Sequence, residues 1–472
     1  MKGLYQVTAT KGRKTISSEV YGDSNNKDSL IARLMNRHKI IHSQRPLFKI
    51  LEIKLNKDMS DDKFKFRDYQ SQIIQEAYEI CEKYRFVYLA MEVRTGKTLT
   101  SLGLADKLGC KEVLFVTKKK AIGSIESDYN LLNPSYNLHT VNYESLHKIE
   151  DVSYDMVILD EAHTLGAFPK PSKRAKQVKE FIHKYRCIIC LMSGTPTPES
   201  YSQMYHQVYG IPSNPFQEYT SFYKFAKDYI DVKQRKINSL YVNDYSRGQQ
   251  SILDKVKPMT ITYTQSEAGF VNKIKEQVLI VKMNDTTHRL ADTLKKDKVI
   301  QGNNEVILGD TPAKCMSKLH QIYSGTVKFE SGESMIFDHS KAEFIKEKFK
   351  GKKIGVFYKF KEEYNALKGV FKDTLCNTLE DFVGSDKNIA LQIVSGREGI
   401  SLKEADVLVY YNIDFSATSY WQSRDRMTTK DRKNSDVYWI FSDGGIEKDI
   451  YKAVIKKKDY TVQHFKKDLL TL

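Results

Sequence analysis

Hydrophobic positions are grouped along the chain in a way that predicts alternating strands and helices. Between residues 59 and 211, short apolar runs such as Phe86–Ala90, Val113–Thr117 and Met156–Leu159 alternate with stretches of helical period. Short continuous apolar runs are typical of strands buried on both faces, as in a parallel sheet with crossover helices. The runs at 353–358, 390–394 and 407–411 predict a second block of the same kind.

The first 58 residues follow another pattern. Leu4–Thr10, Thr15–Tyr21 and Leu47–Leu55 are rich in β-branched and aromatic residues and predict strands, while Lys27–His38 predicts a helix. We therefore expect a small α+β accessory domain at 1–58, an α/β domain at 59–212, a helical connecting region at 213–275 and a second α/β domain at 276–472.

Length and composition narrow the class of protein. The chain has 472 residues, and no apolar run reaches the roughly 18 residues that a membrane helix needs. Its first residues contain no apolar core of a secretory signal, and six scattered cysteines do not form a disulfide framework. We expect a cytoplasmic protein that has no membrane partner and does not require oligomerisation.

Charge is the first indication of a partner. Lys and Arg number 75 against 59 Asp and Glu, for a net charge of +16, and residues 1–58 alone carry 12 basic and 5 acidic residues. This excess suits a polyanion such as nucleic acid, although a lysine-rich composition by itself also fits a solubilising appendage. Lys11, Arg13 and Lys14 lie at a predicted hairpin turn, where long basic side chains can reach phosphates.

A phosphate-binding loop is predicted after the strand Phe86–Ala90. The loop ends in Gly96-Lys97-Thr98, and Leu99–Leu108 has the pattern of a helix. In such a cradle the backbone N–H groups and the lysine bind phosphates, and the threonine hydroxyl binds Mg²⁺. Met91 stands where the usual pattern has glycine, so an ordinary strand-to-helix turn remains the alternative.

An acidic pair follows the apolar run Met156–Leu159. Asp160 lies 63 residues after Lys97, and Glu161 is next to it. Carboxylates at the carboxyl end of a parallel strand can hold Mg²⁺ and orient or deprotonate an attacking water, which are the roles predicted for Asp160 and Glu161. A helix N-cap is the commoner role of a lone acidic pair, but the phosphate cradle in the same unit favours the catalytic one.

A third segment, Ser193-Gly194-Thr195-Pro196, follows the apolar run Cys187–Met192 and is a candidate for coupling. Gly-Lys-Thr, Asp-Glu-Ala-His and Ser-Gly-Thr-Pro in this order resemble the superfamily 2 helicases and translocases. Phe66-Arg67-Asp68-Tyr69-Gln70 is similar to the adenine-reading motif of the Swi/Snf-type branch. The resemblance implies two tandem RecA-like domains and nucleotide contacts from the following residues: Gln70, Arg94, Thr95, Gly96, Lys97 and Thr98.

The same resemblance extends through the second block. Ser395–Leu402 is similar to motif V and includes Gly399, which the resemblance places at the nucleotide. Gln422-Ser423-Arg424-Asp425-Arg426 is similar to the start of motif VI, which implies coupling by Gln422 and an arginine finger at Arg426. The family usually has a second arginine where this chain has Thr429, and Arg424 or Arg432 are candidate substitutes.

Together these features predict an ATP- and Mg²⁺-dependent motor that acts on DNA. Lys118, Lys119 and Lys120 follow a strand at the position where the family contacts DNA phosphates, although a solvated turn is the simpler reading. By analogy, the size and lysine content resemble phage helicases that remodel forks or branched junctions. RNA-directed or restriction-complex motors and a non-hydrolysing binding module remain the alternatives.

Overall fold

The structure is a computed structural model, and its backbone is described for residues 2–11, 14–23, 27, 30–31, 34–35, 49–58, 64–149, 152–237, 240–270, 273–302, 305–396, 401–427 and 434–456. The chain divides into two compact units, with the boundary between Ala268 and Gly269. Within the described residues, no helix is long and apolar enough to cross a membrane.

The N-terminal residues form a three-stranded antiparallel sheet in the order β2-β1-β3. The strands are β1 (Lys2–Lys11), β2 (Lys14–Asp23) and β3 (Lys49–Asp58), close to the predicted ranges. The described residues of the predicted helix are helical, and Leu30, Leu34 and Met35 are buried in the same cluster as alternate residues of β1. One face of this sheet is thus covered by apolar side chains.

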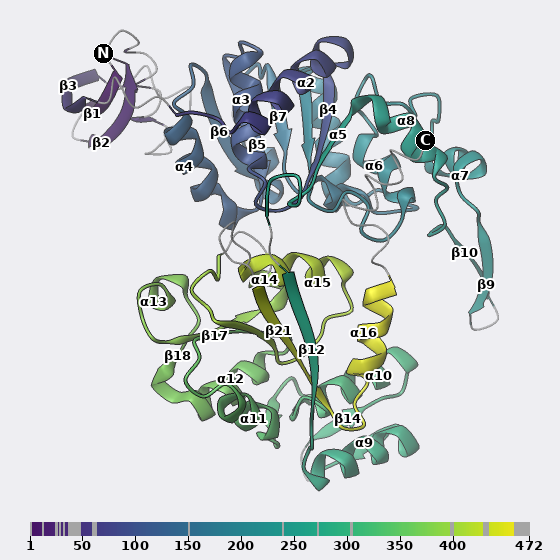
Figure 1. Ribbon diagram of the computed structural model, residues 1–472. Helices are drawn as coiled ribbons and strands as arrows, with labels where there is room; N and C mark the ends of the chain where they lie inside the picture. Colours follow the sequence, from purple (N-terminus) through teal and green to yellow (C-terminus); the bar gives the residue numbers. More distant parts are fainter. Residues whose placement is uncertain are drawn as a thin grey trace. The chain divides into compact units, whose positions relative to one another are not determined.

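A six-stranded parallel sheet forms the centre of the first unit (Figure 1). Its strands, in spatial order, are β11 (Thr260–Tyr263), β4 (Phe86–Met91), β8 (Ile188–Met192), β7 (Met156–Leu159), β5 (Glu112–Thr117) and β6 (Asn137–Asn142). All neighbouring strands are parallel, so the loops after β4, β8, β7 and β5 lie along one edge.

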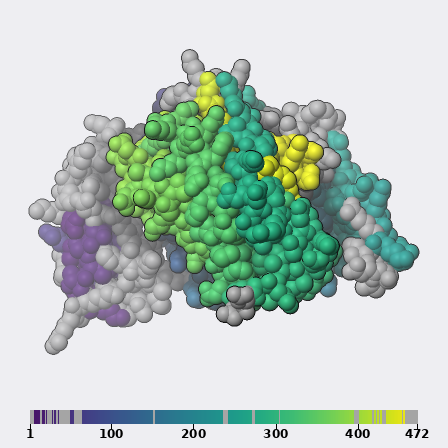
Figure 2. All heavy atoms as spheres, turned by 90° about the horizontal axis from the view of Figure 1, so that it is seen from below, coloured from purple at the N-terminus to yellow at the C-terminus, as the bar shows by residue number. Residues whose placement is uncertain are grey.

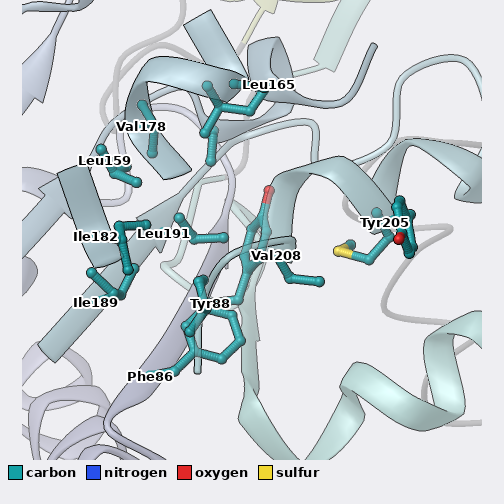
Figure 3. Close-up of a cluster of buried hydrophobic side chains, with 14 of the residues drawn as sticks. Phe86, Tyr88, Leu159, Leu165, Val178, Ile182, Ile189, Leu191, Tyr205 and Val208 are labelled. Atoms are coloured by element: carbon teal, nitrogen blue, oxygen red, sulfur yellow. The ribbon is translucent and has the colours of Figure 1, made fainter. Parts of the chain in front are cut away.

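Helices cover this sheet because its strands are apolar on both faces. They are α2 (Asp68–Tyr84), α3 (Lys97–Lys107), α4 (Ile122–Leu132), α5 (Lys173–Tyr185) and α6 (Met204–Val208). Figure 3 shows one of the two resulting clusters, in which Phe86 and Tyr88 of β4 lie with Ile182 of α5 and Val208 of α6. All six residues of β4 are buried, which agrees with the continuous apolar run in the sequence.

The stretch predicted as a helical connecting region is only partly helical. It contains α7 (Phe222–Tyr229) and α8 (Ser251–Val256), but also the antiparallel hairpin β9 (Lys233–Ile237) and β10 (Leu240–Asp244). Its last strand, β11, pairs with β4 at the edge of the first sheet. The prediction missed these strands because basic residues interrupt the apolar pattern of the hairpin and β11 is short.

The second unit repeats the parallel sheet, with six strands in the order β12-β21-β20-β17-β19-β18. They are β12 (Lys273–Val281), β21 (Asn434–Ser442), β20 (Val407–Tyr410), β17 (Ile354–Tyr358), β19 (Asn388–Gln392) and β18 (Leu375–Cys376). The predicted run at 390–394 is corrected here, since the strand ends at Gln392 and the helical turn α14 (Ile393–Gly396) follows. Two tandem parallel α/β cores confirm the predicted fold class.

Helices and two small hairpins complete the second unit, and Figure 2 shows one face of it. The helices are α9 (Asp285–Asp297), α10 (Pro312–Ile322), α11 (Ser340–Lys348), α12 (Lys361–Phe371), α13 (Leu379–Phe382), α15 (Ala417–Arg424) and α16 (Glu447–Lys456). The hairpins pair β13 (Val299–Gln301) with β14 (Val306–Leu308) and β15 (Thr326–Lys328) with β16 (Ser334–Ile336).

Candidate nucleotide and catalytic site

The loop between β4 and α3 has the backbone of a phosphate cradle. Arg94 and Gly96 have positive φ angles of 64° and 81°, and Lys97 is the first residue of α3. Successive turns of this kind direct N–H groups into a concavity that suits anions, and the first turn of a helix leaves further N–H groups without intrahelical partners. The geometry arises although Met91 replaces the usual glycine, because Met91 is the buried last residue of β4.

The Lys97 side chain folds back across this loop. Its Nζ donates to the carbonyl oxygens of Met91 at 2.9 Å and Glu92 at 3.1 Å. Thr95 is buried, and its hydroxyl donates to the Glu92 carbonyl at 2.7 Å. The ammonium group is thus held at the mouth of the cradle, where it can exchange carbonyl partners for phosphate oxygens.

Tyr69 and Gln70 hold the loop from the side of α2. The Gln70 amide accepts from Arg67 N at 3.1 Å and donates to the Gly96 carbonyl at 3.4 Å. A Cβ on residue 96 would lie 2.5 Å from Gln70 Nε2, so this contact also requires glycine. Tyr69 donates to the Thr95 carbonyl and stacks on Tyr263 of β11. The predicted adenine-reading segment therefore lies against the cradle.

Asp160 follows β7 at the same edge of the sheet. Its Oδ2 accepts from the Thr117 hydroxyl at 2.8 Å, and the backbone of Glu161 also donates to this carboxylate. Burial and the neighbouring charge of Glu161 raise the pKa of Asp160 to about 6. A carboxylate in this setting is stabilised by a cation, which agrees with its predicted role as a ligand of Mg²⁺.

Glu161 is ionised by its surroundings. Burial alone raises the pKa of Glu161, but the hydrogen bond and charge of His163, with the charges of Lys118 and Lys97, hold it well below its usual range. His163 Nδ1 lies 3.2 Å from Glu161 Oε2. The backbone of Glu161 has a φ of 51°, uncommon for a residue with a side chain, which re-aims the carboxylate at the strand end.

Ser193 links the acidic pair to the segment after β8. Its hydroxyl lies 3.0 Å from the same His163 nitrogen and accepts from Thr195 N at 3.0 Å. The Thr195 hydroxyl is buried and has no hydrogen-bond partner within the described part of the chain. A chain of contacts thus runs from Glu161 through His163 and Ser193 to Thr195.

The sequence analysis missed a contact from residues 264–268. Gln265 N donates to Glu92 Oε2 at 2.7 Å, and Gln265 Nε2 donates to the Val93 carbonyl at 3.0 Å. This segment follows β11 and reaches the start of the phosphate loop. No motif marked it, because the pairing of β11 with β4 spans more than 160 residues and is invisible in local sequence.

The three lysines after β5 do not share one environment. Lys119 and Lys120 are exposed in a short 3₁₀ turn, whereas Lys118 is half-buried. The charge of Lys118 helps to lower the pKa of Glu161. The structure therefore associates Lys118 with the acidic pair and leaves Lys119 and Lys120 as exposed candidates for a phosphate contact.

In the second unit, Arg426 lies in the 3₁₀ turn η8 (Asp425–Met427) after α15, where it is half-buried. Its carbonyl accepts from Leu402 N at 2.9 Å. Arg424, named above as a substitute finger, is engaged elsewhere, since its Nη1 lies 3.1 Å from Glu276 Oε1. Glu276 also accepts from Tyr420 and Trp439, so Arg424 belongs to a structural cluster.

The carboxyl edge of the second sheet carries a buried polar network. Asn412, after β20, lies 2.5 Å from His320 Nε2 through its Oδ1 and donates to Glu363 Oε1 at 2.7 Å. Burial lowers the pKa of His320 to about 4, so the imidazole is neutral. Lys359, after β17, forms an ion pair with Asp414 at 3.0 Å. These groups hold the loops after β17 and β20 together.

Some predicted residues lie outside what the structure describes. Arg13, Gly399, Thr429 and Arg432 are outside the described residues, and for Gln422 and Lys14 only the backbone is described. Lys11 is exposed at the end of β1. Among the described residues, no group of three or more His, Cys, Asp or Glu side chains could hold a metal ion by itself.

The comparisons with known proteins agree with this arrangement. A family model described as SNF2-related domain matches residues 69–326, more than half of the chain. The chain therefore belongs to the SNF2-related family, the Swi/Snf-type branch of superfamily 2, and this membership supports an ATP hydrolase. Within the match lie the phosphate loop, the acidic pair and the segment Ser193–Pro196.

Two solved structures match over most of the chain. One is the Sulfolobus solfataricus SWI2/SNF2 ATPase core in complex with dsDNA, with 15% identity and a TM-score of 0.39, over 86% of this chain and 94% of that chain. The other is the SWI2/SNF2 ATPase core domain of the same organism, with 14% identity and a TM-score of 0.37, over 84% and 89% of the two chains. No curated protein matches the sequence.

Proposed function

We propose that this protein hydrolyses ATP with Mg²⁺ and uses the energy to move along or remodel DNA. The observation that carries the proposal is the convergence of Lys97, Asp160 and Glu161 at one sheet edge in a chain of the SNF2-related family. Helicase activity in the strict sense, which requires strand separation, is a finer proposal, as is a preference for forks or branched junctions.

The residues at this edge suit a nucleotide with its metal. Lys97 binds the β- and γ-phosphates together with the N–H groups of Arg94, Thr95 and Gly96, and Gln70 contacts the adenine. Thr98 and Asp160 hold Mg²⁺, whose oxygen-preferring chemistry matches a hydroxyl and a carboxylate. When bound, the metal neutralises charge that develops on the phosphates.

Glu161 acts on the attacking water in this proposal. A base must be ionised to accept a proton, and the lowered pKa of Glu161 supports this state at neutral pH. The contact of its carboxylate with His163, and of His163 with Ser193, transmits the state of the site to Thr195. Gln422 of the second unit has the corresponding coupling role.

The second unit supplies the arginine finger. Arg426 stabilises charge on the transferring phosphoryl group, and Gly399 contacts the nucleotide. Arg424 is set aside because Glu276 already holds it. A single finger at Arg426 therefore accounts for the chain without a second arginine at position 429.

The basic surfaces of the first unit bind the DNA backbone. Lys119 and Lys120 are exposed beside the site, with Lys118 closer to Glu161. Residues 1–58 add Lys11, Arg13 and Lys14 at the β1–β2 turn, and their net charge in the sequence is +7. Contacts of this kind are independent of sequence and weaken with salt.

An ATPase assay of the full chain tests the proposal. Single-stranded, duplex and forked DNA and RNA are compared as stimulants, with Mg²⁺ present or chelated. We expect duplex or forked DNA to stimulate hydrolysis most, and chelation to abolish it. Stimulation by RNA alone would favour an RNA-directed motor, and nucleotide binding without turnover would favour a non-hydrolysing module.

A further inference from the structure

The hairpin β9–β10 projects from the body of the first unit (Figure 1). Its five cross-strand pairs run from Lys233 opposite Asp244 to Ile237 opposite Leu240. Residues directly opposite each other in an antiparallel pair share a face, so Lys236 and Tyr241 lie on one face. The hairpin extends past the helices that cover the first sheet, so the strands stand apart from the core.

Large hydrophobic side chains of this hairpin are exposed to solvent. Tyr241 is 68% exposed and Val242 is 48% exposed. Of the twelve large hydrophobic residues exposed in the described part of the chain, four lie in the segment 223–242. Lys233 and Lys236 are also exposed, and neither has an ion-pair partner among the described residues. The hairpin therefore combines an aromatic ring, aliphatic surface and an excess of positive charge.

The acidic groups near the hairpin are used internally. Asp231 Oδ1 accepts from Gln249 Nε2 at 2.9 Å, and Asp231 N donates to the Arg247 carbonyl at 3.0 Å. Asp244 Oδ1 accepts from Ser246 N at 3.0 Å. These bonds close the base of the hairpin, while the side chains of Lys233 and Lys236 are exposed.

The base is tied to the segment that follows Ser193–Pro196. Ser202 Oγ donates to the Tyr245 carbonyl at 2.7 Å. Gly248 lies so close to this segment that a Cβ would be 2.5 Å from Ser202 N. One helical turn later, Gln207 Nε2 donates to the Pro196 carbonyl at 2.7 Å. The base of the hairpin is thus hydrogen-bonded to the residues that follow the segment proposed to couple the nucleotide site.

We propose that the β9–β10 hairpin is a nucleic-acid contact, which rests on the proposed function of the chain as a DNA motor. Lys233 and Lys236 bind phosphates from opposite faces of the ribbon, and the ring of Tyr241 packs on a base or sugar beside Lys236. A two-stranded ribbon has the width to enter the major groove, and aromatic rings between basic residues suit an unstacked base.

The charge of the β9–β10 hairpin favours nucleic acid over a protein as its partner. The two strands contain Lys233, Arg235 and Lys236 against the single acid Asp244, which already accepts a backbone hydrogen bond. A surface of this sign is matched by the continuous negative charge of a sugar–phosphate chain. Attachment of the hairpin to Ser202 means that load on the ribbon reaches the coupling segment directly.

The test uses the full chain and two kinds of change. The double variant Lys233→Gln/Lys236→Gln removes charge, and Tyr241→Ala removes the ring, with Tyr241→Phe as the conservative variant. The matched control is Lys348→Gln/Lys352→Gln, which removes the same charge from exposed residues before β17, at the opposite edge of the second sheet from the polar network. Affinity is measured for blunt duplex, duplex with a single-stranded end, and single-stranded DNA at several salt concentrations.

The two lysines should contribute about two units to the slope of log affinity against log salt, so their loss should weaken binding on the order of 10-fold near 0.1 M salt. Tyr241→Ala should weaken binding roughly 5-fold or more with an unchanged slope, and Tyr241→Phe should restore it. A larger loss on DNA with a single-stranded end assigns the ring to a base, and an equal loss on blunt duplex assigns it to a groove.

Wild-type protein that binds DNA while the hairpin variants bind as tightly as the control would overturn the hairpin proposal alone. Wild-type protein that binds no nucleic acid would overturn the proposed function and the hairpin with it. A salt slope that falls equally in the control variant would also contradict the proposal, because general charge would then explain the effect. Unchanged melting temperatures of the variants exclude misfolding as the cause.

Discussion

The two parallel sheets have the same number of strands, but their carboxyl edges use polar groups in opposite ways. In the first sheet the charge of Lys97 lowers the pKa of both Asp160 and Glu161, and the charge of Glu161 raises that of Asp160. In the second sheet His320, Asn412 and Glu363 hydrogen-bond to each other and are fully buried. One edge therefore retains charges that a ligand can satisfy. The other joins most of its polar groups to one another and fixes its loops, although His320 Nδ1 is buried without a hydrogen-bond partner among the described residues.

This difference shows how the same sheet architecture can provide a site for a charged ligand in one unit and support for loops in the other. A site for phosphate and metal must keep charged groups that are incompletely compensated without ligand, at some cost in stability. A loop support gains from complete pairing, since each satisfied buried group resists rearrangement. In the second unit the functional candidate, Arg426, lies beyond this network on the turn η8.

The largest expected effects come from the charged edge. Lys97→Ala and Glu161→Gln should each reduce DNA-stimulated ATPase by at least about 100-fold, by different routes. Lys97→Ala removes charge from the phosphates and should weaken nucleotide binding, whereas Glu161→Gln retains Asp160 and should trap bound ATP. Nucleotide titrations of both variants check this, and equal losses of affinity would contradict the assigned roles.

Arg426 is the next test, because it places function in the second unit. Arg426→Ala should lower kcat about 10³-fold with little change in DNA affinity, as expected for a group that acts on transition-state charge. Thr429→Arg should be tolerated. Arg424→Ala serves as the control, since loss of its ion pair with Glu276 should lower stability more than kcat. A larger loss of kcat from Arg424→Ala or Arg432→Ala would show that the motif is assigned in the wrong register.

The sequence predicts the charged edge of the first sheet better than it predicts the polar network of the second sheet. Lys97, Asp160 and Glu161 follow short buried strands, so local motifs located the charged edge correctly. His320, Asn412 and Glu363 are separated by up to 92 residues, and no local pattern indicated that they pair, since their pairing depends on the packing of α10, α12 and β20. Arg424 shows the same limit, because its partner Glu276 is on a distant strand.

Asn412→Ala tests the hydrogen-bonded polar network at the carboxyl edge of the second sheet. Removal of the amide leaves His320 and Glu363 without their shared partner and should cost roughly 2–4 kcal/mol of unfolding free energy. Asn365→Ala is the matched control, because Asn365 makes only an exposed hydrogen bond to Glu362 and should change stability by less than about 0.5 kcal/mol. Denaturant unfolding measures both, and similar values would contradict a supporting network.

A substitution at the charged edge of the first sheet should have the opposite effect and raise the free energy of unfolding. The pKa of Asp160, about 6 against an ordinary 3.8, means that its protonated form is favoured in the folded protein, so stability falls as pH rises from about 4 to 6. Asp160→Asn should therefore stabilise the nucleotide-free protein by about 1–2 kcal/mol at pH 8 and by little at pH 4.5. A gain that is independent of pH would show that charge is not its cause.

Residues 1–58 allow a test with a smaller expected effect, which should leave the carboxyl edges of both parallel sheets unchanged. A chain that begins at Met59 should retain nucleotide binding but bind DNA with a salt slope shallower by up to about three, for Lys11, Arg13 and Lys14. Filter binding across a salt series measures this slope. A lower melting temperature with an unchanged slope would mean that residues 1–58 only stabilise the first unit.

The central claim is that hydrolysis at the charged edge drives movement on DNA. Displacement of a third strand from a duplex tests it most directly, because it reports translocation without strand separation. We predict ATP-dependent displacement by the wild-type protein and none by Glu161→Gln, which still binds ATP and DNA. Duplex-stimulated ATPase without displacement of the third strand would contradict the claim.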